Sequence, residues 1–172
     1  MLKGAVKDKQ TRTKDWGRVH PVIDGLTIKP TRNIVTGNGI TVEAFRSDWP
    51  ETGYDIGHVI HVSLDAGAVT AWHCHETQRD GIFVLTGRVL LVAYDPREDS
   101  PTKGQTTAVR LDGSDPTLVS IPPLVWHGLK ALHGKEANFL NIITHPFKYE
   151  APDEWRVPKD SPEIPFDIVN AV

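Results

Sequence analysis

Cysteine is almost missing from this sequence, which has Cys74 alone among its 172 residues. One cysteine cannot form a disulfide within the chain, so a small disulfide-stabilised fold is excluded. Long hydrophobic runs are missing too: a stretch such as VLLVAY at 89–94 is far too short to cross a membrane. The first 17 residues, MLKGAVKDKQTRTKDWG, lack the apolar segment of a signal peptide. We therefore expect a cytoplasmic protein with no membrane partner.

A strong positive charge is absent as well. The formal net charge is -3, and lysine and arginine form no dense stripe along the sequence. The charge pattern of a nucleic-acid-binding protein is thus excluded. Apolar residues make up 39% of the chain and charged residues 24%, which is ordinary for a globular protein.

Sustained helical periodicity is the third missing feature, since no segment repeats apolar residues at helical spacing over three turns. The sequence instead contains short segments rich in β-branched and aromatic residues, separated by turn sequences such as DGSDP and HGKEA. The pattern predicts strands at 26–29, 40–47, 58–64, 69–75, 81–87, 88–95, 106–111, 117–121, 126–132 and 138–145. The fold class is therefore all-β, as a sandwich or a barrel.

The length suits one domain, which we expect to span residues 19–172. Residues 1–18 are predicted to form an N-terminal arm, mobile or lying on a partner subunit. The tail from Pro152 holds four prolines, at 152, 158, 162 and 165. It should wrap the barrel in extended form, with at most a short helical turn near 153–156.

Two histidines stand out in the segment from Gly67 to Gly87, GAVTAWHCHETQRDGIFVLTG. Side chains alternate between the faces of a strand, so His73 and His75 point to the same side. The chain then turns, and Asp80 begins the returning strand next to this pair. Cys74 points the other way, and we expect it to be buried and inert.

This spacing resembles the first sequence motif of the cupins, with Asp80 where glutamate is usual. The second motif is similar to IPPLVWHG, with Pro122 and His127 in place and Leu124 instead of a glycine. The resemblance implies a jelly-roll barrel with a ligand cavity inside. It also implies that four residues meet there and could hold iron, manganese, nickel or zinc: His73, His75, Asp80 and His127.

A narrower resemblance covers residues 45–167. The run DPREDSPTKG at 95–104, together with APDEWR and the later DSPEIP, is similar to the dTDP-4-dehydrorhamnose 3,5-epimerase family, a branch of the cupins that mostly works without metal. In that family a histidine removes a proton beside the keto group of a sugar. The resemblance implies His73 as this base, Asp160 as the carboxylate that orients it, and His127 as a second histidine of the pocket. It also implies a homodimer.

Three positions depart from the family pattern. Asn141 stands where the family has a tyrosine that acts as the general acid, and an asparagine cannot donate a proton in that role. Thr70 replaces an arginine that grips the nucleotide phosphate, and Ile82 replaces a lysine. Three other residues could donate the proton in place of this tyrosine: Tyr94, Tyr149 and His145. The residues expected to contact substrate are Asn141, His145, Tyr94 and Trp126, although core packing is the favoured role of Trp126.

These observations lead to one leading hypothesis and two alternatives. The leading hypothesis is a cofactor-free epimerase or isomerase of nucleotide sugars that acts beside a keto group, with a histidine–aspartate general base. The first alternative is a metal-dependent oxygenase or isomerase that uses the His73, His75, Asp80 and His127 set. The second is a sugar-binding cupin without catalytic activity.

Overall fold

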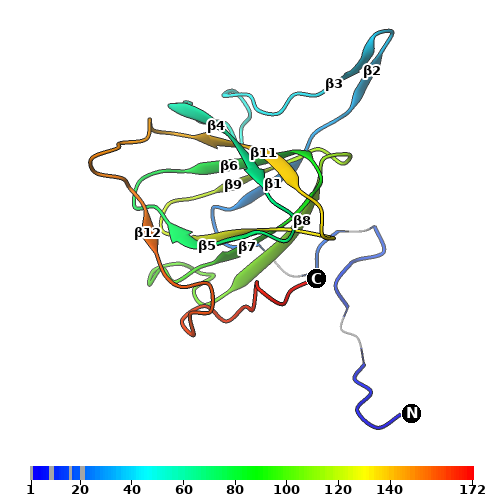
Figure 1. The fold of residues 1–172 in the computed structure, drawn as a ribbon, viewed down its shortest axis with the longest axis vertical. Coiled ribbons are helices and arrows are strands. Elements are labelled where there is room, and N and C mark those ends of the chain that lie inside the picture. Colours follow the sequence, from blue (N-terminus) through cyan, green and yellow to red (C-terminus); the bar gives the residue numbers. More distant parts are fainter. Residues whose placement is uncertain (1, 8–9, 16, 20–21) are drawn as a thin grey trace.

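The computed structural model describes residues 2–7, 10–15, 17–19 and 22–172. These residues form twelve strands and no helix. All strand pairs are antiparallel, and ten strands make two five-stranded sheets (Figure 1). In the part of the chain that is described, no helix has the length and apolar character needed to cross a membrane.

The first sheet has the order β1-β9-β6-β11-β4. Its strands are β1 (Thr27–Pro30), β9 (Thr117–Ile121), β6 (Asp80–Thr86), β11 (Ala137–Ile143) and β4 (His58–Leu64). The second sheet has the order β12-β5-β10-β7-β8. Its strands are β12 (Trp155–Arg156), β5 (Val69–Cys74), β10 (Trp126–Ala131), β7 (Arg88–Tyr94) and β8 (Thr106–Asp112). The predicted all-β jelly roll is confirmed.

The main core lies between the two sheets. Its members are inward-facing aliphatic and aromatic residues of both sheets, among them Val84, Leu91, Leu129 and Phe139, each at most 3% exposed. Burial of such side chains stabilises a fold by about 1.5–3 kcal/mol each. Alternate side chains of each strand point away from this core. The apolar ones on the outer face of each sheet are buried by other segments of the chain.

The C-terminal tail covers the outer face of the second sheet. Ile164 and Ile168 are buried there against Trp72 and Leu90. Trp72 Nε1 donates to the carbonyl of Lys159 at 3.2 Å, which fastens the tail to β5. The helical turn predicted near 153–156 is not formed, because Trp155 and Arg156 pair with Cys74 and His73 as β12.

The outer face of the first sheet is covered by residues 42–54. The strand predicted at 40–47 is confined to β3 (Gly39–Thr41), which pairs with β2 (Ile34–Thr36). Beyond β3 the chain packs irregularly on Phe83, Leu118 and Ile142, with Phe45 and Trp49 among the side chains in contact. Burial of these aromatic rings outweighs the strand propensity of the segment.

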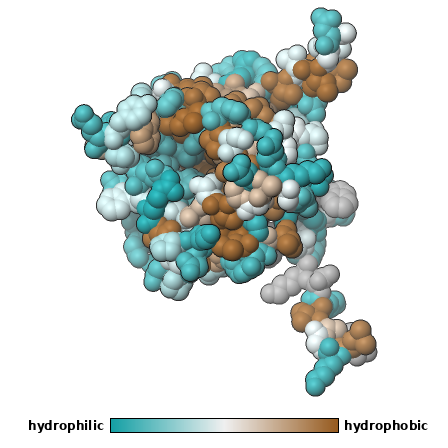
Figure 2. Space-filling view, in the orientation of Figure 1, coloured by the Kyte–Doolittle hydropathy of each residue, from teal (hydrophilic) through white to brown (hydrophobic). Residues whose placement is uncertain are grey.

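The β2–β3 hairpin projects away from the barrel (Figure 1). Its side chains Ile34, Val35 and Ile40 are 50%, 78% and 64% exposed. Figure 2 shows the resulting hydrophobic surface on the hairpin. A two-stranded hairpin is marginally stable in water by itself, so this element favours contact with another surface.

Candidate active site

A cavity of about 390 Å³ lies between the two sheets. One wall carries His73 and, just after β5, His75. The opposite wall comes from the first sheet and carries Ile60, Asp80 and Asn141. Residues that follow β11 border the cavity as well: His145, Pro146, Phe147, Lys148, Ala151, Asp153 and Glu154. The volume is within the range of small-molecule sites, roughly 300–1,000 Å³.

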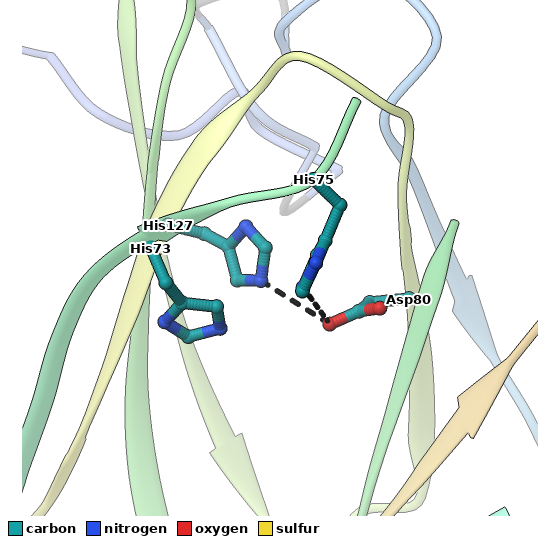
Figure 3. A group of neighbouring side chains, drawn as sticks. All are labelled: His73, His75, Asp80 and His127. Atoms are coloured by element: carbon teal, nitrogen blue, oxygen red, sulfur yellow. Dashed lines mark hydrogen bonds and ion pairs between the residues drawn. The ribbon is translucent and has the colours of Figure 1, made fainter. Parts of the chain in front are cut away.

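Three histidines and one carboxylate converge at the inner end of this cavity (Figure 3). His73 and His75 are each 8% exposed, while Asp80 and His127 are each 1% exposed. One ring nitrogen or carboxylate oxygen from each residue lies within 4.8 Å of all the others. The fold produces this arrangement because β10 pairs His127 directly with His73. Asp80 enters from the opposite sheet at the start of β6.

Asp80 is the hydrogen-bonding centre of the group. Its Oδ2 lies 3.3 Å from His127 Nε2, 3.4 Å from His75 Nε2 and 3.2 Å from Asn141 Nδ2. Its Oδ1 accepts a hydrogen bond of 2.7 Å from Gln78 Nε2. Burial alone would raise the pKa of this carboxyl, but the bonds to His127 and His75 hold the pKa of Asp80 well below its usual range. The side chain is therefore an ionised carboxylate at neutral pH.

The remaining ring nitrogens of two histidines are fixed by backbone carbonyls. His127 Nδ1 lies 3.0 Å from the carbonyl oxygen of Val125, and His75 Nδ1 bonds that of Asp153. A carbonyl only accepts, so both Nδ1 atoms carry hydrogen. In the neutral form of either ring, Nε2 then has a lone pair that faces the carboxylate of Asp80. A lone pair and a carboxylate repel each other. A proton on Nε2, or a cation bound between the rings and Asp80, would turn this repulsion into attraction.

The two histidines of β5 have opposite electrostatic tendencies. Burial and the neighbouring His127 place the pKa of His73 well below 6.5, so this ring is neutral and keeps a lone pair. Burial also lowers the pKa of His75, but its hydrogen bond with Asp80 and the charge of that carboxylate outweigh burial and raise the pKa overall. Two titratable groups whose environments separate their pKa values are a common basis for acid–base catalysis.

Asp153 ties the C-terminal segment to this site. Its carboxylate accepts hydrogen bonds from the backbone N–H groups of Glu76, Thr77 and Gln78, at 2.7–3.0 Å, and from the Thr77 hydroxyl at 2.7 Å. Its carbonyl holds His75 Nδ1. One residue therefore fixes the turn between β5 and β6 and also the orientation of His75.

The predicted His73–Asp160 pair is not formed. Asp160 is exposed on the turn after β12 and borders a different surface depression, together with Lys159 and Ile164. After β12 the chain crosses to the face of β5 that carries Trp72, whose ring bonds Lys159. Strand alternation puts Trp72 on the side opposite His73, so Asp160 lies outside the barrel.

Asn141 and His145 border the cavity as predicted. Tyr94 and Trp126 do not, because both pack with Trp72 under the C-terminal tail. Tyr149 is 85% exposed and stacks edge-on against Phe147. The residues near the histidines that sequence reasoning missed are Gln78 and Asp153. Gln78 shares strand parity with Asp80, but no local pattern in the sequence marks Asp153.

Cys74 is 5% exposed and lies on the outer side of β5, as expected from its parity. Burial raises the pKa of its thiol to about 11. A thiol rather than a thiolate at neutral pH is a poor nucleophile, which agrees with the predicted inert role.

The fold and the site together define a jelly-roll protein with a cavity lined by buried histidines and a carboxylate. A family model described as dTDP-4-dehydrorhamnose 3,5-epimerase matches residues 22–171. The chain belongs to this family of sugar epimerases, as the sequence motifs indicated. It is therefore an isomerase-type enzyme.

Individual relatives agree with the family. The probable low-salt glycan biosynthesis epimerase Agl13 of Haloferax volcanii is 35% identical over 141 residues, which cover 81% of this chain and 90% of that protein. The spore coat polysaccharide biosynthesis protein SpsL of Bacillus subtilis is 32% identical over 85% of this chain and 96% of its own length. The crystal structure of a dTDP sugar isomerase from Desulfovibrio desulfuricans superimposes with a TM-score of 0.80 at 29% identity, covering 87% of this chain and 94% of that chain.

Proposed function

We propose that this protein inverts or isomerises a carbon beside the keto group of a nucleotide-linked sugar, with His73 as the general base. The observation that carries the proposal is the buried, neutral His73 at the wall of a cavity of sugar size. The substrate class is supported by the family and by the dTDP sugar isomerase to which the chain is similar. The relatives Agl13 and SpsL further indicate a role in making glycans or polysaccharides.

In the first step, a ring nitrogen of His73 takes the proton on the carbon beside the ketone. The electrons of the broken C–H bond form the carbon–carbon double bond of an enolate, and negative charge collects on the former keto oxygen. Asn141 Nδ2 uses one of its two hydrogens on Asp80 and borders the cavity, so it is a donor available to stabilise this charge. The ionised Asp80 in turn stabilises the protonated form of His75.

Asp80, and not Asp160, is the carboxylate closest to the histidines of the cavity, although its hydrogen bonds go to His75 and His127 and not to His73. It lies in the cavity, is ionised, and bonds two of the three histidines. His73 Nδ1 is buried and has no hydrogen-bond partner among the described residues. The ring of His73 instead packs edge-on against His127, with 4.1 Å between ring centroids. The orientation of the base therefore depends on packing and on His127.

Solvent exchange tests this function. The protein is incubated in heavy water with dTDP-4-keto-6-deoxyglucose, and deuterium at the ring carbons is followed by NMR and mass spectrometry. Wild-type protein is expected to incorporate deuterium, and His73→Ala should not. The matched control is His61→Ala on β4, because His61 is exposed and does not border the cavity. Ligand binding without exchange in wild type would instead favour a non-catalytic sugar-binding protein.

A second candidate is a metal-dependent enzyme of the same cavity. Two observations favour it: the lone pairs of neutral His75 and His127 converge on the Asp80 carboxylate, and His73 has a buried ring nitrogen without a partner in the described chain. Three imidazoles and one carboxylate fit iron, manganese, nickel or zinc, and carbonyls that hold the outer ring nitrogens are typical of metal-binding histidines. A metal bound here would act as a Lewis acid on the keto oxygen.

The metal content of the purified protein separates the two candidates. The metal hypothesis predicts close to one equivalent per chain, loss of that metal in His75→Ala, and a lower melting temperature after chelation. The acid–base proposal predicts deuterium exchange that survives chelator treatment. Full exchange by protein stripped of metal would remove the second candidate.

We also propose that the chain works as a homodimer in the cytoplasm. The projecting β2–β3 hairpin with exposed Ile34, Val35 and Ile40 supports a second copy as partner, and the lone buried cysteine suits a reducing compartment. Light scattering should give twice the chain mass for wild type and a lower mass for the double variant Val35→Asp, Ile40→Asp. A monomeric wild type would contradict the dimer.

A further inference from the structure

Inversion of a carbon requires a second proton carrier, and His73 cannot be that group. The base removes a proton from one face of the sugar, and inversion returns a proton to the opposite face. His73 and His75 lie on the same wall of the cavity, with only 5.6 Å between their ring centroids, so a sugar ring does not fit between them. The donor must therefore come from the wall formed by the first sheet and the chain that follows it.

The side chains of β11 that border the cavity alternate along the strand. Asn141 and Ile143 are two of them, and His145 continues the same series just past the end of the strand. Asn141 has no acidic proton to give, and its Nδ2 is bound to Asp80. Ile143 is apolar, and Asp80 is ionised. Asp153 is bound by three backbone N–H groups and Glu154 by Arg156, so His145 and Lys148 remain as the basic groups on this side that border the cavity and carry a transferable proton.

His145 is held in place by its neighbours, and the structure records no such bond for Lys148. The ring Nδ1 of His145 lies 3.0 Å from the hydroxyl of Thr144. That hydroxyl also accepts a 3.0 Å hydrogen bond from the backbone N–H of Arg79, across the sheet. Gly57 packs tightly against the same backbone, since a Cβ at Gly57 would lie 2.7 Å from His145 Cα. The imidazole thus stands on a fixed section of chain.

The bond to Thr144 also selects the reacting nitrogen. In an imidazolium both ring nitrogens are donors, so Nδ1–H donates to the Thr144 hydroxyl and Nε2–H is free for a ligand. After Nε2 has given up its proton, the ring is neutral and Nδ1–H still bonds Thr144. The contact is therefore kept in both charge states, as a group that cycles between them requires.

We propose that His145 is the general acid that returns the proton, in place of the tyrosine that Asn141 replaces. The proposal rests on the proposed epimerase function. The Nε2–H bond of the imidazolium breaks and its electron pair stays on nitrogen. The double-bond electrons of the enolate form the new C–H bond on the face opposite His73, and the C=O bond re-forms. His73 has gained one proton and His145 has lost one, and solvent restores both.

The test measures exchange and inversion in the same reaction. With a 4-keto-6-deoxy sugar nucleotide in heavy water, wild type should give both deuterated starting sugar and inverted product. His145→Gln keeps a polar side chain but carries no transferable proton. It should lower inversion by about 100-fold or more, the usual contribution of a general acid, while exchange by His73 stays close to the wild-type rate. Added imidazole should restore inversion to His145→Ala, which a purely structural role would not allow.

Two matched variants complete the design: His61→Gln, an exposed histidine outside the cavity, and Lys148→Met. His61→Gln should invert normally, and Lys148→Met should lower inversion far less than His145→Gln does. Normal inversion by His145→Gln would overturn the proposal. An equal loss of exchange and inversion in folded His145→Gln would overturn it as well. So would a selective loss of inversion in Lys148→Met. A wild type that exchanges but never inverts would overturn it too and leave the base in place. A wild type without exchange would contradict the proposed function itself, and the role of His145 with it.

Discussion

Two buried aspartates of this protein have similar burial but different partners. Asp95 is fully buried and bonds the guanidinium of Arg97 at 2.8 and 2.9 Å, the Ser100 hydroxyl at 2.5 Å and the Thr102 hydroxyl at 2.6 Å. Asp80 is 1% exposed and is surrounded by histidines and amides.

The kind of cation makes the difference between these sites. Arginine is charged at every pH that proteins experience, so Arg97 fixes Asp95 as a carboxylate, and the bonds from Arg97, Ser100 and Thr102 connect the two ends of the loop 95–104. Histidine changes its charge near neutral pH, so the surroundings of Asp80 can take up and release protons. A buried carboxylate with a permanent cation therefore stabilises the fold, and one that shares titratable partners beside a cavity supports chemistry.

Substitution of Asp80 tests this difference between the two aspartates and should have the largest effect, which is a loss of catalysis. Asp80→Asn keeps the size of the side chain but removes the charge that stabilises protonated His75. We expect turnover to fall by about 100-fold or more, the range typical for losing a group that supports acid–base catalysis. The rate of inversion and the rate of deuterium exchange are the measurements. Wild-type turnover in this variant would show that the carboxylate is structural, like Asp95.

The same substitution at Asp95 should lower the stability of the fold and leave catalysis unchanged. Asp95→Asn leaves the Arg97 guanidinium without its anion and removes strong acceptors for two hydroxyls. The free energy of unfolding should drop by about 3 kcal/mol, as for other broken buried ion pairs. Urea denaturation measures this loss. Turnover per folded molecule should be unchanged, and a catalytic defect in fully folded protein would contradict the division between the two sites.

A pH titration sharpens the comparison further. The folded pKa of His75 is raised, so its contribution to stability is complete below the unfolded pKa of about 6.5 and is lost as pH rises through the folded value. NMR of the His75 ring should show a pKa above that of a free histidine. In Asp80→Asn the hydrogen bond and the charge that most strongly oppose burial are gone, so this pKa should fall, whereas Asp95→Asn should leave it in place. An unchanged His75 pKa in Asp80→Asn would remove Asp80 as the cause.

The smallest expected effect concerns Asp153, which is partly buried and has no cationic partner among the described residues. Burial raises the pKa of this carboxyl, but hydrogen bonds from the Thr77 hydroxyl and three backbone N–H groups outweigh it and lower the pKa to about 2. Since the folded pKa is depressed, the stabilisation is present above about pH 4 and is lost as pH falls toward the folded value. Asp153→Asn should reduce the drop in unfolding free energy between neutral and acidic pH. An identical pH profile for the variant would mean that the bonds form equally well without the charge.

The local sequence pattern is sufficient to predict the positions of most strands of the barrel. The strands predicted at 58–64 and 117–121 have the observed bounds, and most others differ by one or two residues at an end, because alternation and turn residues are local signals. Two strands lie outside the predicted set: β2, which forms a local hairpin with β3, and β12, where distant chain segments meet. The β12 strand forms because Trp155 and Arg156 reach the edge of β5, and the sequence around them has no strand pattern of its own.

In the candidate site, too, local sequence pattern predicts some features and long-range contacts determine the others. The sequence by itself determined that His73 and His75 share a face, that Asp80 starts the neighbouring strand and that Cys74 points away, since two-residue periodicity depends on the backbone alone. Only the tertiary structure decided which carboxylates reach the histidines. The family resemblance predicts Asp160, which lies outside the barrel, while Asp153, 78 residues after His75, holds the His75 ring in place. The path of an extended tail is set by the hydrophobic surface it covers and by the strand edge it meets, and neither is encoded within the tail.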